Sequence, residues 1–556
     1  MLRAPLWIAL LLTVALHAGV ARGTADLRVC GTRYLDRHAG VLPRPSTRPS
    51  TASQLPDTIV VGTELDFLVA GDMYLRSGTC QYVGEHCYIF VDTAQWHGNG
   101  GPVGQAHVDE LGELFDRSTP ADPERGMYSL LTEAFGTPAP VDGDERIFIF
   151  VVRLVDPRLV GFFDPRVATW PDPALRRDVV YLNADRLISE PYMVHGTLAH
   201  EFQHLIHHAF NPHEELWINE GLSGYAEALT GFPEVDPTMV PAFLAQPDLD
   251  LTAWSWPPSA AHYGATYLFA AYLAERFGTE LIRALVAEPA TGTAGVNAAL
   301  RRTGWVADFD GVWADWIVAN YASDDDLYGY AALRGRSIQT QSSPSPPFAS
   351  ASWQVMRRWG SRGVVIPVGH LSDDPLWVHF DGDVEVRFRV MTYAMRGLSG
   401  QVTPMELDAV SKGSMQLDPA DSVAVIVGRM SQPLQPSRPG GGFRLAAESQ
   451  PITAVLVETG EVAARVPLLG PAYPNPFNAA TVVPVWLPAA ATVRLSVANI
   501  LGQEVALLLH GGLPQGAHHA MWDGSDRHGQ ALASGLYVIR LQTGDQAYLR
   551  KVMLVR

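Results

Sequence analysis

The hydrophobic and polar positions along the chain form short strand-like runs at first and longer helical repeats afterwards. Runs rich in β-branched and aromatic residues occupy 58–70, 87–96, 142–154 and 176–187. A helical pattern covers 107–117, and from about 193 to 322 apolar residues recur at three- and four-residue spacing in four successive segments. A strand-rich half followed by a helical half predicts an α+β domain over residues 58–340.

The remaining chain reads as β structure in two parts. A Pro/Ser-rich segment at 341–348 interrupts the helical pattern, as a linker would. Strand-like runs at 363–368, 376–380, 384–390 and 422–430 then predict an all-β domain over 349–465, to which the sequence assigns no role. Further runs at 491–500, 504–509, 535–542 and 550–556 predict a second all-β domain over 468–556. The predicted fold class is therefore multidomain, α+β followed by all-β.

The N-terminus predicts export. Residues 1–23 resemble a secretory signal peptide in build, with Arg3 before an apolar run that ends near Val20 and small residues after it. That run is shorter than the ~20 residues that cross a bilayer, and no later segment is long and apolar enough, so no membrane span is expected in the mature chain. Residues 24–57, rich in Pro, Ser and Thr, predict a pro-segment or linker. We therefore expect a secreted protein, extracellular or at the cell surface.

The charge of the chain argues against nucleic acid as a partner. Its 556 residues carry a formal net charge of -18, and no Lys/Arg-rich run provides a local exception. Hydrophobic residues make up 47% of the chain, which supplies enough apolar material for several packed cores.

The segment AHEFQHLIHH at 199–208 contains candidate metal ligands. His200 and His204 are four residues apart, so on a helix they lie one turn apart on one face, where two imidazoles can reach one Zn²⁺ at ~2.0–2.1 Å. Glu201 is placed to take a proton from metal-bound water. This H-E-x-x-H spacing needs a third ligand before it identifies a site.

Two arrangements can supply that ligand. One places a glycine and a third histidine after the motif, but these positions hold His207 and Phe210. The other takes a glutamate from a second helix, and Glu220 follows His204 by sixteen positions. A turn at Pro212 leaves room for that second helix to return antiparallel to the first.

At these residues the sequence resembles known families. HEFQH at 200–204 followed by WINEG at 217–221 resembles the glutamate-zincin metallopeptidases, and the segments 197–206, 214–229 and 262–278 most resemble the hyicolysin-type neutral metallopeptidases. The likeness covers roughly residues 60–322. It implies a zincin-like fold, Zn²⁺ held by His200, His204 and Glu220, Glu201 as general base, and protein or peptide substrates.

Alternatives remain at three points. The segment NEG at 219–221 is also similar to a segment of zinc aminopeptidases. Those enzymes also carry a Gly-x-Met-Glu-Asn strand, and no such sequence precedes His200 in this chain, so an endopeptidase is preferred. A surface-binding or adhesion protein with a degenerate peptidase domain is the rival from another class. A peptidase of this type must stabilise the oxyanion that forms on the attacked carbonyl of its substrate. Tyr263 is the first candidate for this role and His262 the second, while a packing role explains Tyr263 equally well. Further ligands are not expected among His207, His208 and His213.

The C-terminal region carries a second resemblance. Residues 473–488, 497–509, 522–541 and 550–556 resemble type A sorting domains of type IX secretion, which are similar to the immunoglobulin-like domain of flagellar hook-capping proteins. The likeness covers about 468–556 and implies a β-sandwich, with secretion machinery as a partner. Where the family usually has Pro-Ser-Thr after PNPFN, this chain has Ala479-Ala480-Thr481, and a domain that only adds stability is the alternative.

The three cysteines suggest one disulfide. Cys80 and Cys87 have the spacing of a hairpin staple, and a secreted protein meets an oxidising compartment, so we expect them to be bonded. Cys30 is left over. It is either an inhibitory thiolate in the pro-segment, ligating the metal until removed, or a free or removed cysteine.

Overall fold

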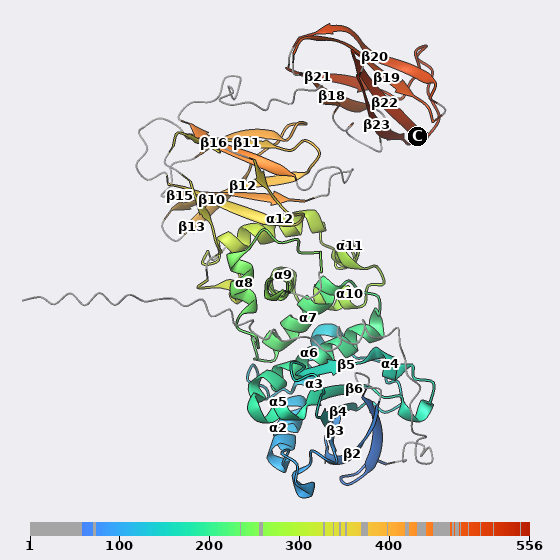
Figure 1. Cartoon of the computed structure of the whole chain (residues 1–556), viewed down its shortest axis with the longest axis vertical. Coiled ribbons are helices and arrows are strands. Elements are labelled where there is room, and N and C mark those ends of the chain that lie inside the picture. The colour runs from blue at the N-terminus through green and yellow to red at the C-terminus, as the bar shows by residue number, and fades with distance from the viewer. Residues whose placement is uncertain are drawn as a thin grey trace, which may run out of the picture.

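The computed structural model describes residues 58–556 except 70–73, 234, 255–258, 326–327, 337, 344–345, 351–352, 368–375, 397–398, 418–421, 431–440, 449–467, 470–471, 473–476, 479, 488, 501, 515 and 545. The predicted signal peptide and pro-segment, with Cys30, lie outside the described residues. Figure 1 shows the described chain rising from a sheet at the bottom, through a layer of helices, to two β domains at the top. The chain is therefore multidomain, with helices and several β sheets.

The first domain is built on a six-stranded sheet in the order β1-β2-β3-β4-β6-β5. Strands β3, β4 and β6 run parallel, while β5 pairs antiparallel with β6 at one edge. Both faces of the central strands are buried, which explains their nearly continuous apolar sequences. The strands are β1 (Glu64–Val69), β2 (Tyr74–Val83), β3 (Cys87–Asp92), β4 (Ile147–Val152), β5 (Gly161–Phe163) and β6 (Val179–Asn183).

Helices cover one face of this sheet and continue into a helical half. Residues of β3 and β4 such as Ile89 and Ile149 share one core with Leu111 of α2 and Phe202 of α6, while Phe90 and Phe148 belong to a separate core on the opposite face. The helices are α2 (Gln105–Asp116), α3 (Met127–Phe135), α4 (Pro165–Ala168), α5 (Ala184–Ser189), α6 (Pro191–Phe210), α7 (Leu216–Leu229), α8 (Met239–Ala245), α9 (Ala260–Phe277), α10 (Thr279–Val286), α11 (Gly292–Arg302) and α12 (Phe309–Tyr321). The strand-rich half followed by a helical half makes this domain α+β.

The two cysteines of this domain are both free and buried, so the predicted Cys80–Cys87 disulfide is wrong. Successive side chains of a strand point to opposite faces of the sheet. Cys80 on β2 lies in the same core as Phe90, whereas Cys87 on β3 lies in the core on the other face, with Ile89. The sheet therefore separates the two thiols, although only six residues lie between them in sequence.

The next domain is a sandwich of two five-stranded sheets. One sheet has the order β13-β12-β15-β10-β7, and the other has the order β14-β11-β16-β8 with β9 also paired to β16. The predicted strand at 384–390 starts later, at Phe388, because the chain first turns with Val386 N–H donating to the Asp383 carbonyl. The strands are β7 (Gln341–Ser342), β8 (Phe348–Ala349), β9 (Gln354–Val355), β10 (Ser361–Pro367), β11 (Leu376–Gly382), β12 (Phe388–Arg396), β13 (Ser399–Pro404), β14 (Lys412–Leu417), β15 (Ser422–Arg429) and β16 (Gly442–Glu448).

This sandwich shares a core with the helical half. Tyr393 of β12 and Ile426 of β15 belong to the same buried cluster as Trp313 of α12. The approach is close, since a Cβ on Gly428 would lie 2.5 Å from the Trp313 ring. Buried Asp325, just after α12, accepts hydrogen bonds from the Tyr393 hydroxyl and from the Gly400 backbone N–H of β13. The Pro/Ser-rich segment at 341–348 therefore joins two parts that pack as one body.

The last domain is a smaller sandwich with sheets in the orders β17-β18-β21 and β20-β19-β22-β23. An ion pair of 3.3 Å between Arg550 and Glu385 connects it to the preceding sandwich. Its strands are β17 (Leu468–Leu469), β18 (Thr481–Leu487), β19 (Ala491–Ala498), β20 (Glu504–Leu513), β21 (Gly516–Trp522), β22 (Gly535–Thr543) and β23 (Gln546–Leu554).

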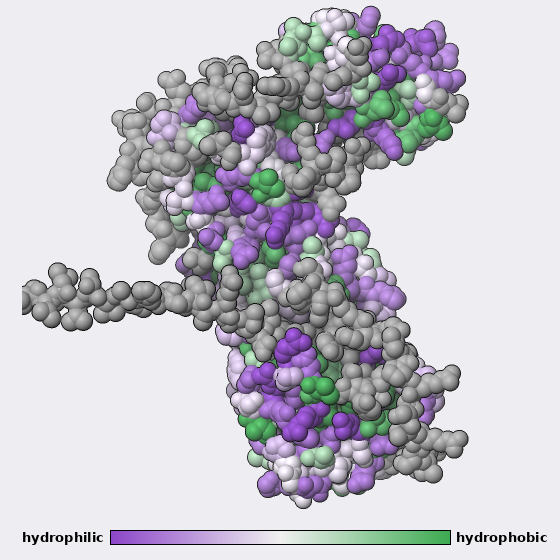
Figure 2. Space-filling model, viewed as in Figure 1, coloured by the Kyte–Doolittle hydropathy of each residue, from purple (hydrophilic) through white to green (hydrophobic). Residues whose placement is uncertain are grey.

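Hydrophobic side chains reach the surface in small groups. On the face seen in Figure 2 they form separate patches among hydrophilic ones, including patches on the C-terminal domain. In that domain the exposed Leu536 and Met553 stand opposite one another on β22 and β23. Among the described residues, no helix combines the length and the apolar character needed to cross a membrane.

Candidate metal centre

Helix α6 holds the histidine motif in its buried middle. The helix starts with Pro191, which suits a first helical turn because its missing N–H would have no helical partner there. Its residues from Val194 to His207 are buried between the sheet and the helical half. His200 and His204 lie one turn apart, with ring centroids 4.8 Å from each other. Because every residue of this stretch is buried, the helix has no solvent-facing side there, and its polar residues are not gathered on one face.

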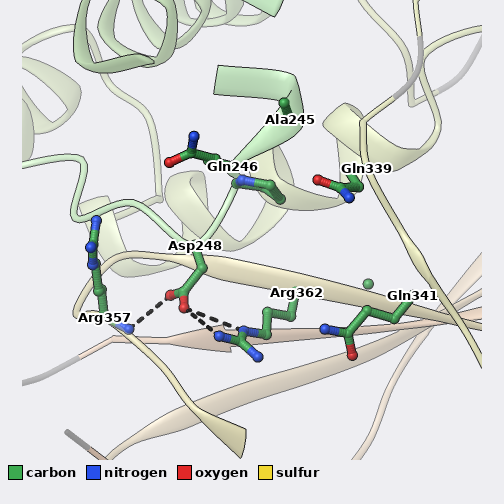
Figure 3. Close-up of a pocket in the computed structure, with 9 residues that line it drawn as sticks. Ala245, Gln246, Asp248, Gln339, Gln341, Arg357 and Arg362 are labelled. Carbon is green, nitrogen blue, oxygen red and sulfur yellow. Dashed lines mark hydrogen bonds and ion pairs between the residues drawn. The ribbon is translucent and has the colours of Figure 1, made fainter. Parts of the chain in front are cut away.

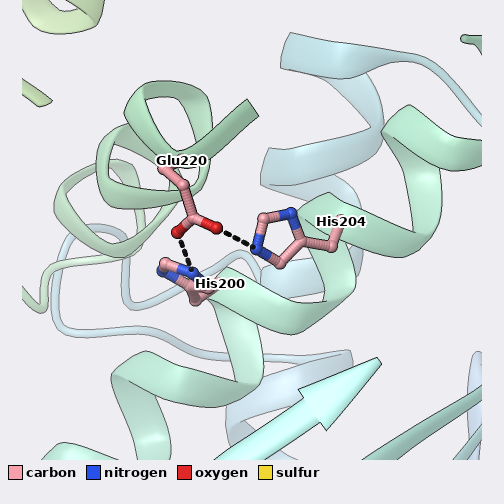
Figure 4. A group of neighbouring side chains, drawn as sticks. All are labelled: His200, His204 and Glu220. Carbon is pink, nitrogen blue, oxygen red and sulfur yellow. Dashed lines mark ion pairs between the residues drawn. The ribbon is translucent and has the colours of Figure 1, made fainter. Parts of the chain in front are cut away.

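Helix α7 brings the glutamate to these two rings. One oxygen of Glu220, Oε2, lies 3.4 Å from His200 Nε2, and the other, Oε1, lies 3.8 Å from His204 Nε2. The Glu220 side chain is fully buried, and Figure 4 shows its carboxylate pointing between the two imidazoles. Among the described residues, these three form the one group of His, Cys, Asp or Glu side chains close enough to hold a metal ion, with ligand atoms within 4.8 Å of one another.

The donor set fits Zn²⁺. Ligand atoms at ~2.0–2.1 Å in a tetrahedral arrangement stand about 3.4 Å apart, close to the separations between Glu220 and the two histidines. Two imidazoles and a carboxylate leave a fourth position open, as catalytic zinc sites do.

A second set of polar groups orients the two histidines. His200 Nδ1 lies 2.8 Å from Oε1 of Glu227, two helical turns beyond Glu220 on α7. His204 Nδ1 lies 3.1 Å from both the Asn219 side-chain oxygen and the Ser223 hydroxyl. Because carboxylate and amide oxygens accept, each imidazole carries its proton on Nδ1 and presents Nε2 toward Glu220. Neither Glu227 nor Asn219 was predicted for this role, although their spacing from Glu220 on one helix is visible in the sequence.

Glu227 therefore yields a prediction about zinc affinity. Loss of a hydrogen-bond partner of a ligating histidine typically weakens metal binding about 10–100-fold, and we expect Glu227→Ala to do so, with Glu227→Gln weaker in effect because its amide oxygen still accepts. Competition with a chromophoric chelator measures the affinity. Glu288→Gln is the matched control, since Glu288 is also buried and is ion-paired to Arg302. Equal zinc affinity in Glu227→Ala and wild type would contradict this role.

Glu201 is held from the sheet side. Its side chain is 1% exposed, and its Oε2 accepts a hydrogen bond of 3.1 Å from the Phe163 backbone N–H of β5. The carboxylate of Glu201 is thus held at the edge strand of the sheet. A contact between α6 and β5 sets the carboxylate in one orientation.

The two candidates for stabilising the oxyanion lie at the start of α9. Tyr263 is 5% exposed, and its ring meets Trp254 edge-on at 5.0 Å. Helix α9 lies close to α7 next to Glu220. A Cβ added to Gly221 of α7 would lie only 2.6 Å from the carbonyl oxygen of Thr266 of α9. His262 Nδ1 lies 2.7 Å from the Ser259 hydroxyl, and burial lowers the pKa of His262, with help from the nearby Arg357 charge. The role of Tyr263 stays a prediction.

The other histidines of the motif region occupy different surroundings. His207 is buried, its Nδ1 lies 3.1 Å from the Asn219 side-chain oxygen, and burial lowers its pKa to about 4. His208 packs its ring against Phe163, and His213 is exposed. Within the described chain, none of the three belongs to the metal-competent group.

A separate pocket of about 310 Å³ lies where the helical half meets the first sandwich. Figure 3 shows Asp248 pointing from the end of α8 toward β10, where it accepts hydrogen bonds from the Arg357 backbone N–H and the Arg362 guanidinium. Its carboxylate therefore ties the two parts together. The pocket is lined by Ala245, Gln246, Pro247, Asp248, Gln339, Gln341, Arg357, Arg362 and Gly363.

Comparison with known proteins identifies the C-terminal domain. Residues 478–546 match the FlgD Ig-like domain, which confirms the predicted immunoglobulin-like β-sandwich and lies wholly within residues 468–556. The search of curated proteins found no match.

Three solved structures that match this chain each overlap with only part of it. PorZ of Porphyromonas gingivalis, described as an essential bacterial surface component of the type-IX secretion system, is 19% identical over 15% of this chain and 11% of its own, with a TM-score of 0.12. Dimeric latent PorU of the same bacterium is 12% identical over 33% and 18%, with a TM-score of 0.16. A Faecalibacterium prausnitzii β-glucuronidase is 11% identical over 35% and 36%, with a TM-score of 0.11. At these TM-scores the overlaps bear on neither the fold nor the function.

Proposed function

We propose that this chain is a secreted zinc-dependent endopeptidase. The observation that carries the proposal is the buried group of His200, His204 and Glu220, with Glu201 fixed beside it. Buried ionisable groups cost stability unless they are paired or ligate a metal, so this concentration of them in one core favours a functional explanation.

The side chains divide the work of peptide hydrolysis. Zn²⁺, when bound, polarises a carbonyl group and lowers the pKa of a water molecule. Glu201 accepts the proton from that water and passes it to the leaving amine, and the Phe163 N–H holds its carboxylate in place for both transfers. Tyr263 is proposed to donate a hydrogen bond to the oxyanion.

The edge strand β5 favours an endopeptidase. An edge strand can accept an extended peptide as an additional strand, and β5 is the edge strand whose backbone also bonds Glu201. A peptide held along β5 would extend past Glu201 in both directions, with residues on each side of the bond to be cleaved. An aminopeptidase would instead need a group that captures the free amine of the substrate.

Zinc content and proteolysis together test this proposal. The full chain, purified with zinc, is expected to hold about one Zn²⁺ and to hydrolyse unfolded casein, with both properties lost on treatment with a chelator and restored by zinc. Metal analysis and release of acid-soluble peptides measure the two. Zinc binding without hydrolysis of casein would instead support the surface-binding protein with a degenerate peptidase domain.

For the C-terminal domain, we propose a role in export by type IX secretion. The FlgD Ig-like match and the sequence resemblance of residues 468–556 to sorting domains support it. Deleting the chain after Leu468 is expected to retain casein hydrolysis while the protein accumulates in the periplasm of a bacterium with this secretion system. Unchanged release into the medium, measured by immunoblotting, would leave the domain a structural or binding role.

A further inference from the structure

The outer face of one sheet in the first sandwich carries an unusual set of side chains. Leu376, Val378 and Phe380 of β11 point into the sandwich core, so the alternate residues Trp377, His379 and Asp381 point outward. The other sheet of this sandwich packs against α12. The outward face of β11 therefore points away from the helical half.

The register of the strands arranges this face in three rows. The middle row is His379 between Ser414 of β14 and Ala446 of β16. On one side of it, Trp377 stands between Gln416 and Glu448, and on the other Asp381 stands between Lys412 and Arg444. Small residues thus flank His379, while larger side chains form the rows on both sides.

An exposed tryptophan extends the second of these rows. Trp353, 41% exposed, lies under the Arg444 guanidinium, which is 5.1 Å from its ring centroid. With Trp377, the face presents one aromatic side chain in each outer row. Flat aromatic surfaces of this kind pack against the C–H groups of a ring-shaped ligand.

Polar atoms on the same face retain hydrogen-bonding capacity. His379 is 5% exposed and its Nδ1 bonds the Ser414 hydroxyl, but within the described residues its Nε2 has no partner. The same holds for Trp377 Nε1 and Arg444 Nε. Buried polar atoms without partners cost stability, so their concentration on one outward face calls for an explanation. Ser414, beside His379, is exposed, and the Lys412 side chain is 51% exposed, so a ligand can reach the middle row at the Ser414 hydroxyl.

The charges on the face select among ligands. Lys412 and Arg444 are balanced by Asp381 and Glu448, and Lys412 is ion-paired to Asp381 at 3.5 Å. A balanced face provides no net attraction for a polyanion such as nucleic acid or an acidic polysaccharide. Its many donors and acceptors suit a ligand rich in hydroxyl groups.

We propose that this face binds a neutral oligosaccharide, with Trp353 and Trp377 stacking on sugar rings and the exposed Ser414 hydroxyl, which bonds to buried His379, hydrogen bonding to a hydroxyl group of the sugar. Such a site would hold the protein on a glycan-covered surface. It is separate from the metal centre and does not depend on the proposed peptidase activity.

Affinity electrophoresis of the full chain tests the proposal. Native gels containing xylan, laminarin, galactomannan or hydroxyethylcellulose are compared with a plain gel and with a gel containing the polyanion alginate. We expect retardation in at least one neutral gel and a loss of affinity of about tenfold or more in Trp353→Ala and Trp377→Ala. Trp305→Ala, in which a tryptophan of similar exposure (44%) outside this face is removed, is the matched control and should migrate as wild type.

The thermal melting curve of each variant shows whether it is folded. Trp353 is exposed, so Trp353→Ala keeps the test valid if the more buried Trp377→Ala is destabilised. If wild type is retarded in a neutral gel and Trp353→Ala is not, the site is supported even when Trp377→Ala is too unstable to be tested. The proposal is overturned if no neutral polysaccharide retards the chain, if alginate alone does, or if Trp353→Ala and Trp305→Ala bind equally well.

Discussion

Replacing Glu201 with glutamine is expected to leave zinc bound while casein hydrolysis falls by several powers of ten. Glutamine keeps the size of the side chain, and its amide oxygen can still accept the Phe163 N–H that holds Glu201. The substitution removes the basic carboxylate. General acid–base catalysis contributes about 10²–10⁴-fold to the rate of hydrolysis, and loss of water orientation lowers the rate further. Zinc analysis and casein hydrolysis are measured on the same preparation.

The control for this variant is Glu280→Gln, a glutamate in the first turn of α10, which should match wild type in both measurements. If Glu201→Gln cleaved casein at nearly the wild-type rate, the general base would have to be sought elsewhere. If it lost zinc instead, Glu201 would act in metal binding or folding rather than in proton transfer.

Removing Glu220 is expected to abolish zinc binding and proteolysis together. Glu220→Ala takes away the one carboxylate of the ligand group and leaves two buried imidazoles, so the loss of zinc affinity should exceed the roughly 10–100-fold expected for Glu227→Ala. Because a ligand that binds only the folded protein stabilises it, zinc should also raise the melting temperature of wild type much more than that of this variant.

The comparison with Glu227 distinguishes a ligand from an orienting residue. Both glutamates lie on α7 and are buried, so general destabilisation should affect the two variants alike. Chelator competition and melting with and without zinc are run on both. Full zinc affinity in Glu220→Ala would move the search for the third ligand to His207, His208, His213 or Glu227.

The sequence came closest to the structure where the relevant geometry is local. The spacing of His200 and His204 places them on one face of any helix, and α6 has them there. Glu220 was a harder inference because it needed a second helix, a turn between the two and an antiparallel return. The structure brings Glu220 to both histidines, whereas the metal itself and the chemistry stay predictions.

Errors arose where strand pairing decides the outcome. Cys80 and Cys87 are close in sequence, but a register irregularity after Cys80 and the alternation of side chains place them on opposite faces. The segments that form β13, β14 and β16 were not predicted as strands. Their sequences, such as KGSMQL and GFRLAAE, contain too few β-branched residues to stand out, and pairing with neighbouring strands stabilises them instead.

By itself the sequence determined that the chain is multidomain, that His200, Glu201 and His204 share one helix, and that the C-terminal domain is an immunoglobulin-like sandwich. Each of these depends on periodicity or on residues close together in the chain. Only the tertiary structure decided that β5 holds Glu201, that Glu227 orients His200, and that the first sandwich shares a core with α12. These contacts join residues far apart in sequence, and their geometry follows from how whole helices and sheets pack, which no local pattern encodes.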